Sequence, residues 1–242
     1  MKKIFIVFAF IPWLSSVQVS KLFDANDFSL GLNFSPDYCY RTLKSKDALS
    51  KSYGEQLDKV EYPKMGYTMG LNIRKPIHRR ITIETGINFS SQGGKRIAYD
   101  HILTIIPGTG ETMLAIKETT TYHNSFMNIP IKADYYLMVE RVKLFVSLGI
   151  EPNFLFRQKT DWSMEFDDGH KESGTSTNDM GTRAFNLSMI AGIGLSYDII
   201  NKLYLIIQPE YRRALLPTST NYSNLTEYPF SIGLNTSIFY KL

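Results

Sequence analysis

Hydrophobic and polar residues alternate along most of the chain with a period of two, which is the period of a β-strand rather than of a helix. The closing stretch FSIGLNTSIFYKL shows the pattern clearly, because Phe230, Ile232 and Leu234 alternate with Ser231 and Gly233. Similar alternation recurs in seven earlier stretches. We therefore predict eight strands, at residues 28–40, 65–74, 81–92, 127–137, 144–156, 185–197, 203–211 and 230–242.

The connections between these strands are alternately short and long. Those after the second, fourth and sixth strands are tight turns, whereas the others are long and polar. This order is typical of a membrane barrel with short periplasmic turns and long extracellular loops. The predicted fold class is all-β: an eight-stranded antiparallel up-and-down transmembrane β-barrel, closed by pairing of the last strand with the first. Long connections are expected at residues 41–62, 93–120, 158–182 and 215–227.

Alternation alone does not show which face of the wall lies outside, because a soluble lipocalin-like barrel also alternates, with its apolar face inward. Glycines fall on the polar parity, and the narrow lumen of an eight-stranded barrel favours small side chains. The other parity carries bulky Ile, Leu, Met, Phe and Tyr, as contact with lipid requires. We therefore predict a polar lumen and a lipid-facing apolar wall in the bacterial outer membrane. The glycines concerned are Gly31, Gly66, Gly70, Gly86, Gly149, Gly192, Gly194 and Gly233.

Charged residues of both signs also take the polar parity. An isolated buried ion costs several kcal/mol, so enclosed charges must be paired or hydrogen-bonded. We predict a lumenal network of ion pairs that plugs the barrel; the alternative is that most of these charges lie near the rims in water. The predicted members are Glu84, Lys132, Asp134, Glu151, Arg157, Glu210 and Arg212.

Three prolines, Pro130, Pro152 and Pro209, fall inside predicted strands. Proline lacks the N–H that a strand donates to its neighbour, and a closed barrel has no free edge to accommodate it. We expect a β-bulge at these positions, or a location beyond the membrane band.

The first residues differ from the rest of the chain. Lys2 and Lys3 precede an apolar run over residues 4–14, which predicts a secretory signal peptide at residues 1–20 and a barrel domain at residues 21–242. The net charge is +4, and the lysines and arginines are scattered along the chain rather than clustered, so the sequence does not indicate a nucleic-acid partner. The single cysteine excludes an internal disulfide, so a closed barrel is expected to hold the exported protein together.

The stretches NSFMNIPIKADYYL and KLFVSLGIEPNFLF, at residues 124–137 and 143–156, resemble the PorT-like outer-membrane β-barrel family of Bacteroidetes-type bacteria. The resemblance covers residues 27–242 and implies an outer-membrane barrel, and the family's namesake is associated with protein secretion and gliding machinery. From the alternation, the unequal loops and the glycine parity we predict a structural, binding or secretion-accessory role that acts through the long loops. Outer-membrane lipid is an expected partner. So is the barrel assembly machinery, because an alternating terminal strand with an aromatic residue near its end resembles the signal that it reads. Other envelope or secretion proteins are expected to bind through the extracellular loops.

The enzymatic alternative is a lipid-modifying barrel. His123 and Ser125 form an outward-facing H-x-S motif that resembles the motif of the lipid A deacylase barrel. A serine nucleophile needs a base and an acid that orients this base, yet Glu118 has the opposite parity and Glu140 lies in the opposite turn. No pair of histidines has metal-ligand spacing. We therefore predict a non-enzymatic barrel with no catalytic residue, no metal and no cofactor.

Overall fold

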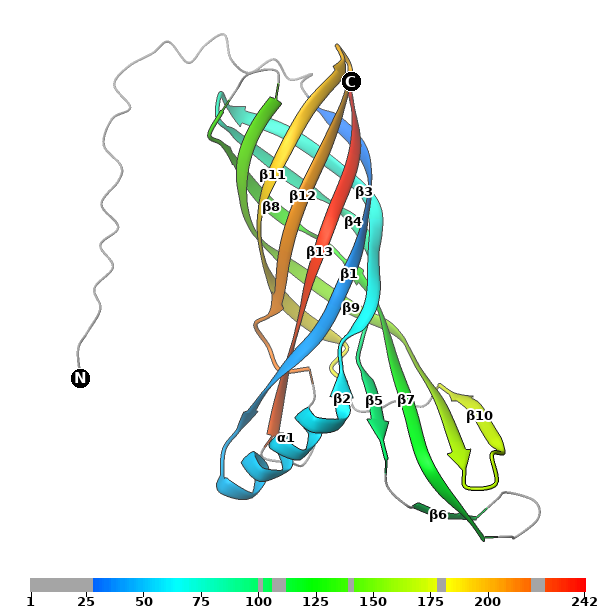
Figure 1. Ribbon diagram of the computed structural model, residues 1–242. Coiled ribbons are helices and arrows are strands. Elements are labelled where there is room, and N and C mark those ends of the chain that lie inside the picture. The colour runs from blue at the N-terminus through cyan, green and yellow to red at the C-terminus, as the bar shows by residue number, and fades with distance from the viewer. Residues whose placement is uncertain (1–27, 100–101, 106–111, 139–141, 178–181, 219–224) are drawn as a thin grey trace.

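A computed structural model describes residues 28–99, 102–105, 112–138, 142–177, 182–218 and 225–242, and these form a closed antiparallel barrel with an extended arm at one end (Figure 1). The last strand pairs with the first from Ser29↔Lys241 to Ser45↔Leu225, which confirms the predicted eight-stranded barrel. The wall contains, in order, β1 (Ser29–Ser45), β3 (Lys64–His78), β4 (Ile81–Gln92), β7 (Thr112–Asn128) continued by β8 (Ile131–Tyr136), β9 (Val142–Phe166), β11 (Phe185–Ile200), β12 (Leu203–Ala214) and β13 (Leu225–Lys241).

The apolar parity of the strands faces outward. On β1, Leu32 is 67% exposed while its neighbours Asn33 and Ser35 are 6% and 0% exposed. This orientation suits a wall surrounded by lipid and not a soluble barrel with an apolar lumen. The outward apolar residues mark the membrane-spanning segments, at residues 30–40, 65–73, 83–89, 127–135, 142–156, 185–200, 203–211 and 230–240.

Two of the lumenal glycines make room for aromatic rings near the end with short turns. Gly194 lies directly opposite Phe145, and Gly31 lies opposite Phe239. A Cβ atom at Gly194 would stand 2.2 Å from the ring of Phe145, and one at Gly31 would stand 2.4 Å from the ring of Phe239. Both rings are fully buried in one apolar cluster. The glycines thus allow an aromatic layer to fill the narrow lumen.

The prolines affect the wall less than expected. At Pro130 the strand is interrupted between β7 and β8, and the N–H of Ile129 donates to the carbonyl of Pro152 at 3.0 Å. At Pro209 the pairing of β11 with β12 is interrupted between Gly192↔Glu210 and Leu195↔Ile207 and resumes in the same register. The prediction of a bulge at Pro209 is therefore wrong. One missing donor is tolerated without a register shift because the strands on either side remain paired.

The long connections are partly regular structure, which corrects the expectation of polar loops. β7 and β9 continue to pair beyond the membrane band as far as Ala115↔Phe166. This extension was not predicted because its two faces are similarly polar, as in KETTTYHN at residues 117–124, so no hydrophobic alternation marks it. The arm adds the short strands β2 (Glu61–Tyr62), β5 (Lys95–Ala98), β6 (Ile102–Ile105) and β10 (Lys171–Ser176).

A helix that was not predicted, α1 (Ala48–Val60), lies at the same end as the arm (Figure 1). Asp47 caps it with a capping box, and Gly54 packs near Leu43 and Leu225. No described helix is long and apolar enough to cross a membrane. The predicted signal peptide falls in residues 1–27, which lie outside the described residues.

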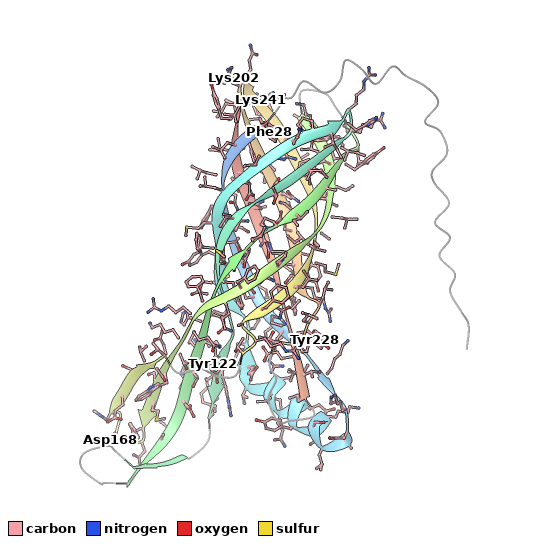
Figure 2. The ribbon with its side chains drawn as sticks, turned by 180° about the vertical axis from the view of Figure 1, so that it is seen from behind. Phe28, Tyr122, Asp168, Lys202, Tyr228 and Lys241 are labelled. Atoms are coloured by element: carbon pink, nitrogen blue, oxygen red, sulfur yellow. The ribbon has the colours of Figure 1, made fainter. Side chains whose placement is uncertain are left out.

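Figure 2 shows how the two ends differ. Phe28, Lys202 and Lys241 lie at the end with the short turns, which the loop pattern assigns to the periplasm. Asp168 lies at the tip of the β9–β10 hairpin and Tyr228 lies near the other end of the barrel, which the same loop pattern assigns to the extracellular side.

Candidate functional site

A chain of ion pairs crosses the lumen of the barrel. Lys132 on β8 lies 2.8 Å from Glu84 on β4 and 2.8 Å from Glu210 on β12. Because β8 and β12 are not neighbours in the wall, the Lys132–Glu210 pair spans the interior. Glu84 also binds Nε of Arg74 at 3.1 Å. The lumen is therefore bridged by charged groups from several strands.

Both ends of this chain of ion pairs terminate on a carboxylate. Arg74 pairs with Asp134, and at the other end Arg212 pairs with Asp37 at 3.0 Å. The hydroxyl of Thr68 donates to Asp37 at 2.6 Å, so this carboxylate is held from two strands. The whole set, which we call the lumenal chain, runs Asp134, Arg74, Glu84, Lys132, Glu210, Arg212, Asp37.

The lumenal chain is fully enclosed and continues into the aromatic layer. None of its members is more than 4% exposed. The guanidinium of Arg74 lies 5.5 Å from the ring centre of Phe145 and 5.3 Å from that of Phe239. These contacts have cation–π geometry, so they join the ionic plug to the apolar layer on its periplasmic side. Buried ion pairs of this kind stabilise only when every partner is present.

The structure brings together five of the seven predicted lumenal residues. Glu151 is buried at 1% exposure in the same lumen, but it makes no hydrogen bond or ion pair with another described residue. Arg157 is exposed, so its predicted place in the network is wrong. The reason is a bulge between the pairs Ser125↔Arg157 and Phe126↔Leu155, which reverses the parity of β9. The five are Glu84, Lys132, Asp134, Glu210 and Arg212.

Sequence reasoning missed Asp37 and Arg74 as members of the network. Asp37 has the same parity as Gly31 on β1, and Arg74 has the same parity as Gly70 on β3. The alternation rule that selected the other residues applies to these two equally. Applied to every charged residue inside a predicted strand, it finds both.

Two cavities lie at opposite ends of the lumenal chain. The basal cavity, of about 320 Å³, opens at the periplasmic end, and Arg74 forms part of its lining together with Thr82. Among the described residues, no group of three His, Cys, Asp or Glu side chains is arranged to hold a metal ion. The mouth cavity, of about 250 Å³ at the extracellular end, is lined in part by Gln92, Tyr122, Phe126, Thr218, Glu227 and Phe230.

The H-x-S motif lies on the arm, and its histidine is already engaged on both sides. Nδ1 of His123 lies 2.7 Å from Nζ of Lys64, and Nε2 lies 3.2 Å from Oδ2 of Asp161. Asp161 is the acid that sequence reasoning did not find, because it lies on the unpredicted extension of β9. No hydrogen bond joins Ser125 to His123, although both are described. With its two nitrogens occupied, the imidazole has no position left to accept a proton from Ser125.

We expect His123 to titrate below its ordinary value. Burial lowers the pKa of this imidazole from 6.5, and the neighbouring Lys64 lowers it further, while Asp161 raises it. Lys64→Met should therefore raise the pKa of His123, and Asp161→Asn should lower it. Because the unfolded chain binds this proton at a higher pH, the contribution to stability is present above the unfolded pKa and is lost as the pH falls through the lower, folded pKa.

The measurement for His123 is a pH titration of the histidine ring signals by NMR in detergent micelles, with assignment from a His123→Gln variant. Opposite shifts in the two neighbour variants support a neutral imidazole held between a cation and a carboxylate. If the pKa of His123 is the same in the native protein and both neighbour variants, the arrangement is absent in solution.

Comparisons with known proteins give similar solved structures and one matching family. Neisserial surface protein A is similar with 11% identity and a TM-score of 0.43, over 89% of this chain and 97% of that chain. The Escherichia coli outer membrane protease OmpT is similar with 10% identity and a TM-score of 0.46, over 90% of this chain and 97% of that chain. A major outer membrane protein of Thermus thermophilus is similar with 9% identity and a TM-score of 0.42, over 89% of this chain and 99% of that chain. At these identities the likeness concerns the fold alone. The comparison with curated proteins finds no match. A family model described as outer membrane protein beta-barrel domain matches residues 18–215. Because this match covers most of the chain, the protein belongs to the outer membrane protein β-barrel domain family and is located in the bacterial outer membrane.

Proposed function

We propose that this protein is a non-conducting barrel that acts by binding at its extracellular end. The observation that carries the proposal is the lumenal chain, in which Lys132 bridges carboxylates on opposite parts of the wall at 2.8 Å. A lumen closed by buried ion pairs and an aromatic layer leaves no aqueous path for solutes. The remaining surface available for function is the outside, and its largest elaborated part is the extracellular arm with α1.

The extracellular end offers surface for a protein partner. On α1, Leu49 is 86% exposed and Tyr53 is 51% exposed. Exposed aromatic and aliphatic side chains on a capped helix are suited to the apolar centre of an interface. The resemblance of the sequence to the PorT-like family supports a structural or secretion-accessory use of this surface, with envelope or secretion proteins as partners.

A non-enzymatic role is also part of the proposal. It is supported by the engagement of both nitrogens of His123 with Lys64 and Asp161, which leaves the lipid-modifying alternative without a general base. Outer-membrane lipid then surrounds the outer face of the barrel and is not a substrate. The assembly machinery is a partner only while the barrel is inserted into the membrane.

Conductance measurements test the closed lumen. The refolded protein, added to a planar lipid bilayer beside a general porin as positive control, should give no conductance steps. The double variant Phe145→Ala, Phe239→Ala removes the aromatic layer but leaves the lumenal chain, so it should also stay silent. Uniform steps from the native protein would overturn the proposal. Steps from the double variant alone would show that the aromatic layer, and not the ion pairs, closes the barrel.

A further inference from the structure

Aromatic side chains form a belt on the outer face of the barrel at its extracellular end. Phe230 on β13 lies between Tyr40 on β1 and Tyr211 on β12, and its ring centre is 6.1 Å from each of theirs. The three spanning segments end at these residues, which take the outward parity of their strands. Aromatic rings in this position mark the boundary between the hydrocarbon and the lipid headgroups. Outward side chains that follow them along the strands therefore lie at headgroup depth.

Two cations follow the aromatic belt on the same face. Arg213 is the next outward residue of β12 and pairs with Phe230 in the wall. Its Nη2 donates to Oγ1 of Thr42 at 3.2 Å, so its side chain crosses β13 and reaches β1. Lys44 is the outward residue after Thr42, and its Nζ lies 4.8 Å from the ring centre of Tyr228. We call Arg213, Thr42, Lys44 and Tyr228 the rim patch; Tyr228 marks its place in Figure 2.

The rim patch holds its two charges close enough together to bind one phosphate group. Thr42 and Lys44 are two residues apart on one face of β1, which is about 7 Å along a strand. The hydroxyl of Thr42 donates to the carbonyl of Tyr228 at 3.3 Å and so fixes the oxygen to which Arg213 donates. With described residues the guanidinium makes only this hydrogen bond, so its other N–H groups can bind two phosphate oxygens side by side.

Neither cation of the rim patch has an ion pair with a carboxylate of the described residues, since Lys44 lies over a ring and Arg213 against a hydroxyl. The cation on the inner face of the same strand, Arg41, is balanced, because it pairs with Glu61 and lies 3.4 Å from Asp58. Two unbalanced cations favour an anionic ligand. The rim patch lies at headgroup depth directly above an apolar wall, so the anion that it meets there is joined to acyl chains.

We infer that the rim patch binds the phosphate group of an outer-leaflet lipid whose acyl chains lie along the outer face of β12, β13 and β1. Arg213 and Lys44 hold the phosphate, and the ring of Phe230 packs against the first part of the chains. The lipid is a bound ligand and undergoes no reaction. This binding goes beyond the proposed function and does not depend on a closed lumen, because it requires only that this end of the barrel is extracellular.

Native mass spectrometry tests this inference on the full chain, refolded in a polyoxyethylene detergent that carries no phosphate. The probes are lipid A with its phosphates and the same lipid A after their removal, which have identical acyl chains. The phosphorylated lipid should bind saturably and about tenfold more tightly than the other. Arg213→Gln and Lys44→Gln each remove one charge and keep a polar side chain, so each should weaken binding of the phosphorylated lipid by about tenfold.

The matched control is Lys202→Gln at the periplasmic end (Figure 2). Lys202 lies 5.6 Å from the ring centre of Tyr240, so this variant removes the same charge from the same kind of contact with a tyrosine. It should leave binding unchanged. A loss equal to that of Lys44→Gln would mean that total charge sets the affinity, which overturns the inference.

Equal binding of the two forms of lipid A also overturns the inference, because the acyl chains alone would then account for the binding. So does equal binding in the native protein, Arg213→Gln and Lys44→Gln. Displacement of the lipid by an equal concentration of inorganic phosphate would identify a site for free phosphate instead. Absence of binding overturns the inference too, and heat-modifiable migration shows for every variant that the barrel is folded. Conductance is measured separately, so an open pore that still binds the phosphorylated lipid contradicts only the proposed function.

Discussion

Lys132→Met should destabilise the folded barrel by about 3–5 kcal/mol, because it leaves two buried carboxylates without their shared cation. Lys132 is 3% exposed and lies 2.8 Å from both Glu84 and Glu210. Methionine fills a similar volume, so the loss measures charge rather than packing. The free energy of unfolding is measured by urea titration in lipid vesicles, with the folded fraction read from heat-modifiable migration.

The control for Lys132 is another lysine ion pair at the rim. Lys143 lies 2.7 Å from Asp198, but the two side chains are 26% and 32% exposed. Solvent screens such a pair, so Lys143→Met should cost less than about 1 kcal/mol. Glu84 keeps its ion pair with Arg74 when Lys132 is lost, but the lumenal chain then holds an excess of negative charge. Adding Glu84→Gln to Lys132→Met removes one of these negative charges and should restore part of the stability. Equal losses for the Lys132 and Lys143 variants would mean that water reaches the lumen and that the plug is not closed.

Much of the barrel could be predicted because each strand has one face in lipid and one in a polar lumen. This contrast imposes alternation residue by residue, so the sequence around Leu32 and Asn33 already shows which side chain points outward. Glycine parity added the direction, since Gly31 and Gly194 lie where aromatic rings need room. The members of the lumenal chain could be predicted because charged residues on the polar parity face the lumen. The same rule applies to Asp37 and Arg74.

The extracellular arm could not be predicted in this way, because no apolar environment distinguishes its two faces. The extension of β9 beyond Phe156 is held by its ladder with β7, and backbone hydrogen bonds leave no pattern in the sequence. The bulge opposite Phe126 also leaves no pattern in the sequence, and it moves Arg157 to the outer surface. The contact of His123 with Asp161 depends on this extended pairing, so it appears only in three dimensions.

Leu148→Arg should destabilise the barrel by about 2–4 kcal/mol in lipid vesicles, which is the cost of a cation on the lipid face near the middle of the membrane. Leu148 lies near the centre of the spanning part of β9, and its side chain is 65% exposed on the outer face. Its lumenal neighbour Ser147 is 1% exposed, so the outward direction is well defined. The measurement is again urea unfolding in vesicles.

Leu49→Arg is the matched control, because Leu49 is even more exposed, at 86%, but lies on α1 outside the spanning segments. In water an arginine there replaces an exposed apolar side chain, and the change in stability should stay within about 0.5 kcal/mol. If Leu148→Arg were as harmless as Leu49→Arg, the outer face of β9 would be in contact with water. Exposure alone therefore does not set the cost. The difference between the two changes in unfolding free energy measures the cost of placing an arginine in the membrane. The original residue and its replacement are the same in both variants, and only the surroundings of the side chain change.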